Sequence, residues 1–224
     1  MHPIFLLADS QLLFWTECGR PFLERVRECL GGGPPVAAYV GASNSDRPEF
    51  FSIFQAAMEQ VGIRDCRMIR SEYGPHDRAS LLAADVVLLA GGDVARGWGV
   101  MERTGMGADL VARYRSGAVL MGISAGAVLL GQKGWAEEEG EPRPFDTLGL
   151  VPLVVDAHDE ARGWDRLRWV VQAPPGGLEG VGIPTGGGLV YGPGGGLHSV
   201  RRPATRFSAK GAQVQTTLLA PSDD

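Results

Sequence analysis

Cysteine and positive charge are both scarce in this chain, and each shortage argues against a class of protein. The three cysteines, Cys18, Cys29 and Cys66, form no C-x-x-C pair, which favours reduced packing thiols over a disulfide framework or a zinc site. Lysine and arginine total 21 against 26 acidic residues, for a formal net charge of −5. No basic field is therefore available to hold nucleic acid, and we expect neither a metal nor a nucleic-acid partner.

Long apolar runs and nucleotide-binding glycine motifs are missing as well. No apolar run reaches the roughly 20 residues that a membrane-spanning helix requires, and the N-terminus shows no secretory signal pattern. Neither G-x-G-x-x-G nor G-x-x-x-x-G-K occurs, which argues against a nucleotide cofactor. We expect a cytoplasmic protein that uses no cofactor and makes no membrane contact.

Apolar strand-like runs alternate with helical patterns along most of the chain. The expected strands are residues 4–7, 36–40, 86–89, 119–121 and 150–155. The clearest helix is residues 49–61, whose apolar side chains recur at spacings of three and four. Other helices are expected at residues 22–29, 78–83, 108–114, 125–131 and 165–171. Continuous apolar strands separated by helices predict an α/β fold, a three-layer sandwich with a mainly parallel central sheet.

From about residue 174 onward the chain becomes rich in glycine, and the short runs 188–191 and 197–200 predict late antiparallel strands. A chain of 224 residues has room for one α/β core and little for a second. We expect a single catalytic-type domain over residues 1–224, with a core of 1–202 and a C-terminal tail or hairpin at 203–224.

The strongest chemical signal is the segment Gly122-Ile123-Ser124-Ala125-Gly126, which lies between an expected strand and an expected helix. A nucleophile elbow needs this context, because small flanking residues permit a strained turn that holds the serine above the sheet. The following helix N-terminus also favours developing negative charge. The segment predicts that Ser124 is a nucleophile.

A glycine pair, Gly91-Gly92, ends another expected strand and is followed by Asp93. Ligand sites in parallel sheets lie beyond the carboxyl ends of the strands, so this turn and Ser124 should meet there. The backbone N–H groups of Gly92 and Ala125 can then form an oxyanion hole. The pattern equally fits a plain strand-to-helix turn.

A serine nucleophile requires a base, and the chain has four histidines. His158 is the best placed of them, because it follows the expected strand 150–155 and so lies at the same edge of the sheet. His2, His76 and His198 belong to the terminus, a polar loop and the late strands.

Several segments together resemble peptidase E and the cyanophycinases. They are Tyr39-Val40-Gly41-Ala42-Ser43-Asn44, the Gly91-Gly92-Asp93 turn, the Ser124 segment, Leu148 to Pro152 leading to Asp156-Ala157-His158, and Gly182-Ile183-Pro184. The resemblance covers about residues 1–200. It implies a fold like that of class I glutamine amidotransferases, with serine in place of cysteine, and cleavage after aspartate in aspartyl dipeptides or β-aspartyl-arginine units.

Carried over by position, the resemblance implies that Ser124 is the nucleophile and His158 the base, with the Gly92 and Ala125 amides as the oxyanion hole. Arg162 and Arg166 match arginines that hold a substrate carboxylate, although both can instead line a solvated helix face. Asp93 is a further candidate for binding substrate.

The sequence departs from the family at Thr185, where these enzymes commonly supply a glutamate as third triad member. A threonine oxygen can accept the imidazole N–H but cannot stabilise the imidazolium. Candidate replacements are Asp156, Asp159, the more distant Asp165 and the glutamate run 137–139, which includes Glu139.

The leading hypothesis is a serine peptidase that cleaves a small acidic peptide through an acyl-enzyme, with a homodimer left open. One alternative is an α/β-hydrolase esterase with His198 as base, which the short chain and the lack of an HGGG motif disfavour. The other is a family member with a degenerate triad, marked by Thr185, that acts on another amide or only binds its ligand.

Overall fold

The computed structural model describes residues 1–138, 141–173, 177–210 and 213–221. Its centre is a seven-stranded sheet in the order β13-β12-β1-β7-β6-β4-β5. Five neighbouring strands of this sheet run parallel: β1, β7, β6, β4 and β5. Strands β12 and β13 extend the sheet beyond β1 with antiparallel pairing. The strands are β1 (Ile4–Leu7), β4 (Val36–Val40), β5 (Asp65–Ile69), β6 (Val86–Leu89), β7 (Val119–Ile123), β12 (Gly188–Tyr191) and β13 (Leu197–Val200).

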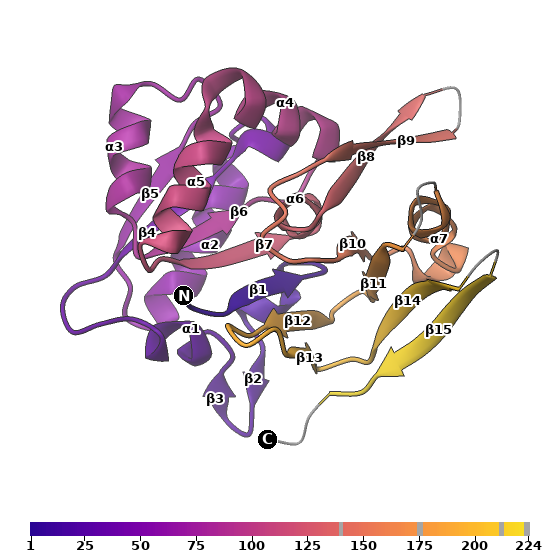
Figure 1. The fold of residues 1–224 in the computed structure, drawn as a ribbon. Helices are drawn as coiled ribbons and strands as arrows, with labels where there is room; N and C mark the ends of the chain where they lie inside the picture. Colours follow the sequence, from indigo (N-terminus) through magenta and orange to yellow (C-terminus); the bar gives the residue numbers. More distant parts are fainter. Residues whose placement is uncertain (139–140, 174–176, 211–212, 222–224) are drawn as a thin grey trace.

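Helices cover both faces of this sheet, which gives the expected three-layer α/β sandwich (Figure 1). Alternate side chains of each central strand enter different cores: Phe5 and Leu7 pack toward α1 and α2, whereas Ile4 and Leu6 pack toward α3 to α6. Strands covered on both faces must be apolar throughout, which is why their sequences show no polar alternation. The helices are α1 (Glu24–Glu28), α2 (Pro48–Gln60), α3 (Pro75–Ala83), α4 (Val94–Thr104), α5 (Met106–Arg115) and α6 (Ala125–Leu130).

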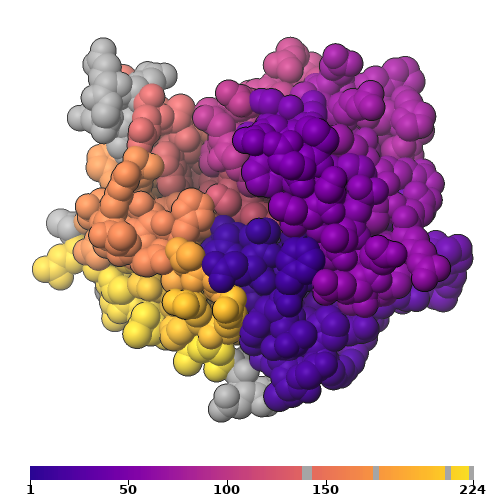
Figure 2. Space-filling model, turned by 180° about the vertical axis from the view of Figure 1, so that it is seen from behind, coloured from indigo at the N-terminus to yellow at the C-terminus, as the bar shows by residue number. Residues whose placement is uncertain are grey.

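A second sheet of four strands, β10-β11-β14-β15, lies beside the first. Its strands are β10 (Val154–Ala157), β11 (Glu179–Ile183), β14 (Ala204–Lys210) and β15 (Gln213–Leu219), and α7 (Asp165–Gln172) packs against it. The expectation that residues 150–155 add a strand to the central sheet is wrong, because β10 starts at Val154 and pairs in parallel with β11. In Figure 2 this later part of the chain, orange to yellow, forms one side of the molecule.

Two glycines of β11 let α7 approach the second sheet closely. A Cβ at Gly182 would lie 2.5 Å from the Trp164 ring, and one at Gly180 would lie 2.7 Å from Val171. The ring of Trp164, at the start of α7, is therefore buried against bare backbone. This packing fixes the loop between β10 and α7.

The remaining elements are small. They are the hairpins β2 (Thr16–Glu17) with β3 (Arg20–Pro21) and β8 (Lys133–Glu138) with β9 (Glu141–Asp146), and the single turns η1 (Ser10–Leu13), η2 (Ala42–Asn44) and η3 (Glu160–Arg162). None of the described helices is long and apolar enough to cross a bilayer. All three cysteines are free thiols; Cys29 and Cys66 are half-buried, but Cys18 is exposed and so has no packing role.

Candidate active site

Ser124 occupies a strained turn between β7 and α6. Its backbone has φ 50° and ψ −111°, a combination that L-residues rarely adopt and that costs on the order of 1–3 kcal/mol. Small neighbours make the turn possible, because a Cβ at Gly126 would lie 2.1 Å from the carbonyl oxygen of Leu89 and one at Gly122 would lie 2.5 Å from that of Gly126. The strand, turn and helix expected around Ser124 are present.

The glycine pair after β6 lies directly against this turn. A Cβ at Gly91 would be 3.4 Å from the Ser124 Cβ, and Gly92 has φ +139° with the Ser43 carbonyl oxygen 2.2 Å from where its Cβ would stand. In the described part of the chain, the N–H groups of Gly92 and Ala125 donate to no protein acceptor. Both amides therefore keep their hydrogen-bonding capacity beside the Ser124 hydroxyl.

His158 faces Ser124 from the end of β10. Its Nε2 is 2.7 Å from Ser124 Oγ, and its backbone, also at positive φ, donates a 2.9 Å hydrogen bond to Ile183 of β11. His198, the base of the alternative esterase reading, lies in β13 and lines a cavity that does not include Ser124. The structure thus brings together the serine and the histidine that the sequence singled out.

A carboxylate that the sequence analysis missed lies near this pair. Glu160 Oε1 accepts a 3.0 Å hydrogen bond from the backbone N–H of Thr185. Burial raises the pKa of the Glu160 carboxyl, but hydrogen bonds from its own backbone and from Thr185, together with the charge of His158, outweigh burial and hold the pKa below its usual value. The available signal was its position two residues after the histidine.

The other candidates for orienting His158 have different partners. Among the described residues, no hydrogen bond joins His158 to a carboxylate or to Thr185. Asp156 is buried and its Oδ1 accepts the Ala157 N–H at 2.8 Å, while Asp159 Oδ1 lies 3.8 Å from Arg162 Nε. Glu139 lies outside the described residues, and Glu137 of the same run forms an ion pair with Arg166.

Asp156 has an unusual environment for an acid. Burial is the largest influence and raises the pKa of this carboxyl from 3.8 to about 7, with the charge of Asp159 adding to the rise and the Ala157 N–H and Arg166 opposing it. In the described structure its Oδ2 atom is buried without a hydrogen-bond partner. The charged form of Asp156 is therefore costly unless a cation reaches it.

Two cavities flank the serine and histidine, and both include Gly92, Ser124 and His158. The first has a volume of about 390 Å³ and is also lined by Asp156, Asp159, Arg162 and Arg166. We call it the arginine cavity. Arg162 and Arg166 come from η3 and α7, so the packing of Trp164 on β11 sets their position. A guanidinium pair beside a nucleophile can hold a substrate carboxylate.

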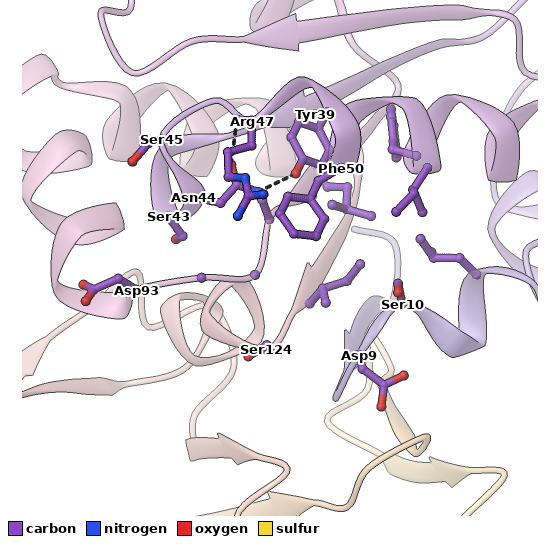
Figure 3. Close-up of a pocket in the computed structure, with 18 of the residues that line it drawn as sticks. Asp9, Ser10, Tyr39, Ser43, Asn44, Ser45, Arg47, Phe50, Asp93 and Ser124 are labelled. Carbon is purple, nitrogen blue, oxygen red and sulfur yellow. Dashed lines mark hydrogen bonds between the residues drawn. The ribbon is translucent and has the colours of Figure 1, made fainter.

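The second cavity is larger, about 550 Å³, and we call it the α2 cavity. Its wall is mainly apolar, with side chains of Leu13, Tyr39, Phe50, Ile53 and Phe54, and its polar lining includes Arg47, Asp93 and Arg96. Figure 3 shows Arg47, Tyr39 and Phe50 together on one wall. Asp93, a candidate for binding substrate, lines this cavity, but its Oδ1 caps α4 by accepting the Arg96 N–H at 2.7 Å.

These features define the class of the protein. It is an α/β protein that carries an exposed serine–histidine pair beyond the ends of its strands. The profile of peptidase family S51 matches residues 15–191. Peptidase E of Streptomyces coelicolor is 31% identical over 161 residues, which are 69% of this chain and 63% of that protein, so the match spans less than two thirds of the relative's length. The chain belongs to peptidase family S51, a family of serine-type peptidases.

Solved structures show the same fold. A peptidase from an acI-B1 Actinobacterium superposes with a TM-score of 0.70 at 15% identity, over 98% of this chain and 95% of that one. A putative peptidase E protein from Listeria monocytogenes superposes with a TM-score of 0.62, also at 15% identity, over 98% of this chain and all of the other. These likenesses establish the architecture expected from the sequence.

Proposed function

We propose that this protein hydrolyses the peptide bond after an N-terminal aspartate, with Ser124 as nucleophile and His158 as base. The observation that carries the proposal is the 2.7 Å contact between Ser124 Oγ and His158 Nε2 at a strained turn. A hydroxyl in this position can give its proton to the imidazole as it attacks a carbonyl carbon. The exposed pair also opens onto two cavities that can receive the two sides of a scissile bond.

The proposed reaction has two halves. Ser124 Oγ bonds to the carbonyl carbon while its proton moves to His158 Nε2, and the N–H groups of Gly92 and Ala125 hold the oxyanion. The C–N bond then breaks, the proton on Nε2 passes to the leaving amine, and an ester to Ser124 remains. Water attacks this ester, gives its proton to Nε2, and releases the aspartyl product as the proton returns to Oγ.

The arginine cavity supports aspartate as the acyl residue. Arg162 and Arg166 supply two guanidinium groups for its side-chain carboxylate. Asp156, with its buried and unpartnered Oδ2, lines the same cavity and can accept the substrate's α-ammonium group. A charged amine would also stabilise the ionised form of this carboxyl. This arrangement suits a free N-terminal aspartate better than an internal one.

Glu160 is the carboxylate that we assign to the histidine. The family's glutamate position is occupied by Thr185, and the Thr185 N–H holds the Glu160 carboxylate nearby. The charge of His158 helps to keep Glu160 ionised, and in the proposed mechanism the negative charge of Glu160 stabilises the imidazolium that forms when Ser124 gives up its proton. In this arrangement Glu160 is a positioning and electrostatic residue and does not touch the substrate.

A fluorophosphonate probe and a peptide panel test the proposal together. The protein should form a single adduct on Ser124, absent in Ser124→Ala, and should hydrolyse Asp-X dipeptides in preference to Asn-X and N-acetyl-Asp-X. If the adduct forms but every Asp-X peptide is untouched while another amide or ester turns over, aspartate specificity is wrong.

A binding protein is the second candidate, and one observation favours it. No described carboxylate makes a hydrogen bond to His158, so the imidazolium lacks the direct partner of a complete triad. Such a protein would bind acidic peptides in the arginine cavity without turnover. Absence of any Ser124 adduct after prolonged treatment would select this candidate.

A further inference from the structure

The apolar face of α2 extends beyond the core of the protein. Phe54, Ala57 and Met58 of this face are buried against the central sheet, whereas Phe50 and Ile53, nearer the N-terminal end, are 40% and 36% exposed. Both exposed side chains line the α2 cavity. Large apolar side chains that line an open cavity beside reactive groups indicate a site for an apolar ligand, because covering them removes apolar surface from water.

The position of the cavity determines which part of a substrate it can receive. The α2 cavity and the arginine cavity share Gly92, Ser124 and His158, so a bond broken at Ser124 has one side in each. Under the proposed function the aspartyl side occupies the arginine cavity. The leaving side, which takes its proton from His158, must then occupy the α2 cavity.

The charged groups of the cavity differ in their existing partners. Asp9 and Asp93 already accept backbone N–H groups, at 2.8 Å from Gln11 and 2.7 Å from Arg96. Arg47 lies over the Phe50 ring and forms an ion pair with Glu49. The Arg96 guanidinium contacts the Ser45 hydroxyl at 2.7 Å, and among the described residues it has no carboxylate partner. Arg96 is therefore the cation best able to accept a new carboxylate.

We propose that the α2 cavity is the leaving-side subsite and takes a C-terminal residue with a large apolar side chain. The side chain packs on Phe50 and Ile53, and the terminal carboxylate binds Arg96. This inference rests on the proposed function and deepens it: the substrates are dipeptides of aspartate followed by a bulky apolar residue.

Dipeptides that differ only in the second residue test the side-chain contact. The kcat/KM for Asp-Phe and Asp-Leu should exceed that for Asp-Gly by about tenfold or more, a typical discrimination for an apolar pocket. Phe50→Ala should lower kcat/KM for Asp-Phe by about tenfold and leave Asp-Gly nearly unchanged. Leu82→Ala, which truncates an exposed apolar side chain of α3 outside the cavity, is the matched control.

An amide blocks the terminal carboxylate and tests Arg96. The wild-type protein should hydrolyse Asp-Phe about tenfold faster than Asp-phenylalaninamide, and Arg96→Gln should remove this preference. Arg103→Gln, on an exposed part of the same helix, should retain it. Equal rates on Asp-Phe and its amide in both the wild type and Arg96→Gln would overturn the carboxylate contact.

Binding of free amino acids separates this inference from the proposed function. Calorimetry should show that L-phenylalanine binds the wild-type protein at least tenfold more tightly than glycine, and that Phe50→Ala removes the difference. If no Asp-X peptide is hydrolysed, the proposed function fails and this binding experiment still decides the cavity. If Asp-Phe and Asp-Gly are hydrolysed equally and phenylalanine binds no better than glycine, the inference fails and the proposed function stands.

Discussion

The backbone N–H of Thr185 donates a 3.0 Å hydrogen bond to the carboxylate of Glu160, two residues after the histidine that contacts Ser124. The residue type at position 185 therefore does not settle whether a carboxylate is present near the imidazole. The backbone at that position holds a carboxylate supplied from elsewhere in the chain.

Glu160→Gln should lower kcat/KM for Asp-X peptides by about tenfold, less than the loss of a directly bonded triad acid. Because the imidazolium loses a nearby negative charge, the acidic limb of the kcat/KM–pH profile should move to lower pH. Glu59→Gln, on the exposed face of α2, is the control. Thr185→Glu in the Glu160→Gln background should recover part of the activity, and an unchanged profile in Glu160→Gln would contradict the assigned role.

Arg162→Gln and Arg166→Gln, made singly, test the carboxylate clamp. Each should lower kcat/KM for Asp-X peptides by about 10- to 100-fold while changing that for Asn-X peptides much less, because only the charged side chain needs a cation. Arg168→Gln, on the helix α7 that carries Arg166 but against Phe207, should change kcat/KM for neither kind of peptide. Equal losses on acidic and neutral substrates would indicate a structural role for the arginines.

Gly92→Ala tests the backbone geometry beside Ser124. A methyl group there meets the Ser43 carbonyl oxygen at 2.2 Å in a backbone conformation of φ +139°, so the turn must shift and activity should fall by at least about 100-fold. Gly99→Ala, in α4, is the matched control, since nothing lies within 4 Å of the position that the added Cβ would occupy. It should raise stability by about 0.5–1 kcal/mol through helix propensity, measured by thermal unfolding, and leave activity intact.

Asp156→Asn should change how the stability of the protein depends on pH. The wild-type carboxyl has a pKa of about 7 in the folded protein, against an unperturbed value of 3.8. Below about pH 4 it is therefore neutral in both the folded and the unfolded protein and does not lower the free energy of unfolding. Between about pH 4 and 7 the unfolded chain ionises first, so this group destabilises the fold progressively, by at most about 4 kcal/mol above pH 7.

The variant lacks this titration, so the difference in free energy of unfolding, variant minus wild type, should rise from pH 4 to pH 7. Urea unfolding at each pH measures it, and the trend is independent of any constant cost of the amide. Asp65→Asn is the control: Arg67 holds the pKa of that exposed carboxyl below its usual value of 3.8, so the carboxyl is ionised in both the folded and the unfolded protein above about pH 4, and the difference should stay nearly flat from pH 4 to pH 7. A difference that stays flat for Asp156→Asn would contradict the prediction.

Local patterns in the sequence predicted the central sheet and the Ser124 turn well. Apolar runs predicted four of its five parallel strands, and the short runs 188–191 and 197–200 predicted β12 and β13. Strand β5 was missed because its sequence, Asp65-Cys66-Arg67-Met68-Ile69, mixes charge with apolar residues on a sheet edge. Helix α4 was missed because it contains Gly97 and Gly99, which are poor helix formers. Gly97 is required there by packing, since a Cβ would lie 2.3 Å from Ser43 Oγ.

The site was predictable only where its residues follow strands. Ser124 and His158 could be paired because both lie at strand ends, although their strands belong to different sheets. The contact between Glu160 and Thr185 joins residues 25 apart in sequence, and no local pattern specifies it. The α2 cavity was missed for a related reason: Phe50 and Ile53 belong to the same apolar stripe as the buried side chains of α2, and only the fold reveals that the core ends before them.

The serine belongs to the central sheet and the histidine to the second sheet, so their hydrogen bond spans two separately paired layers. Helix α6 lies between them, and a Cβ at Gly131, at its end, would stand 2.7 Å from the Leu153 carbonyl oxygen just before β10. A hydrogen bond weakens steeply when its atoms separate by a further ångström. A methyl group at Gly131 therefore has to displace either the end of α6 or the chain leading into β10, and such a displacement acts on the serine–histidine contact without changing either residue.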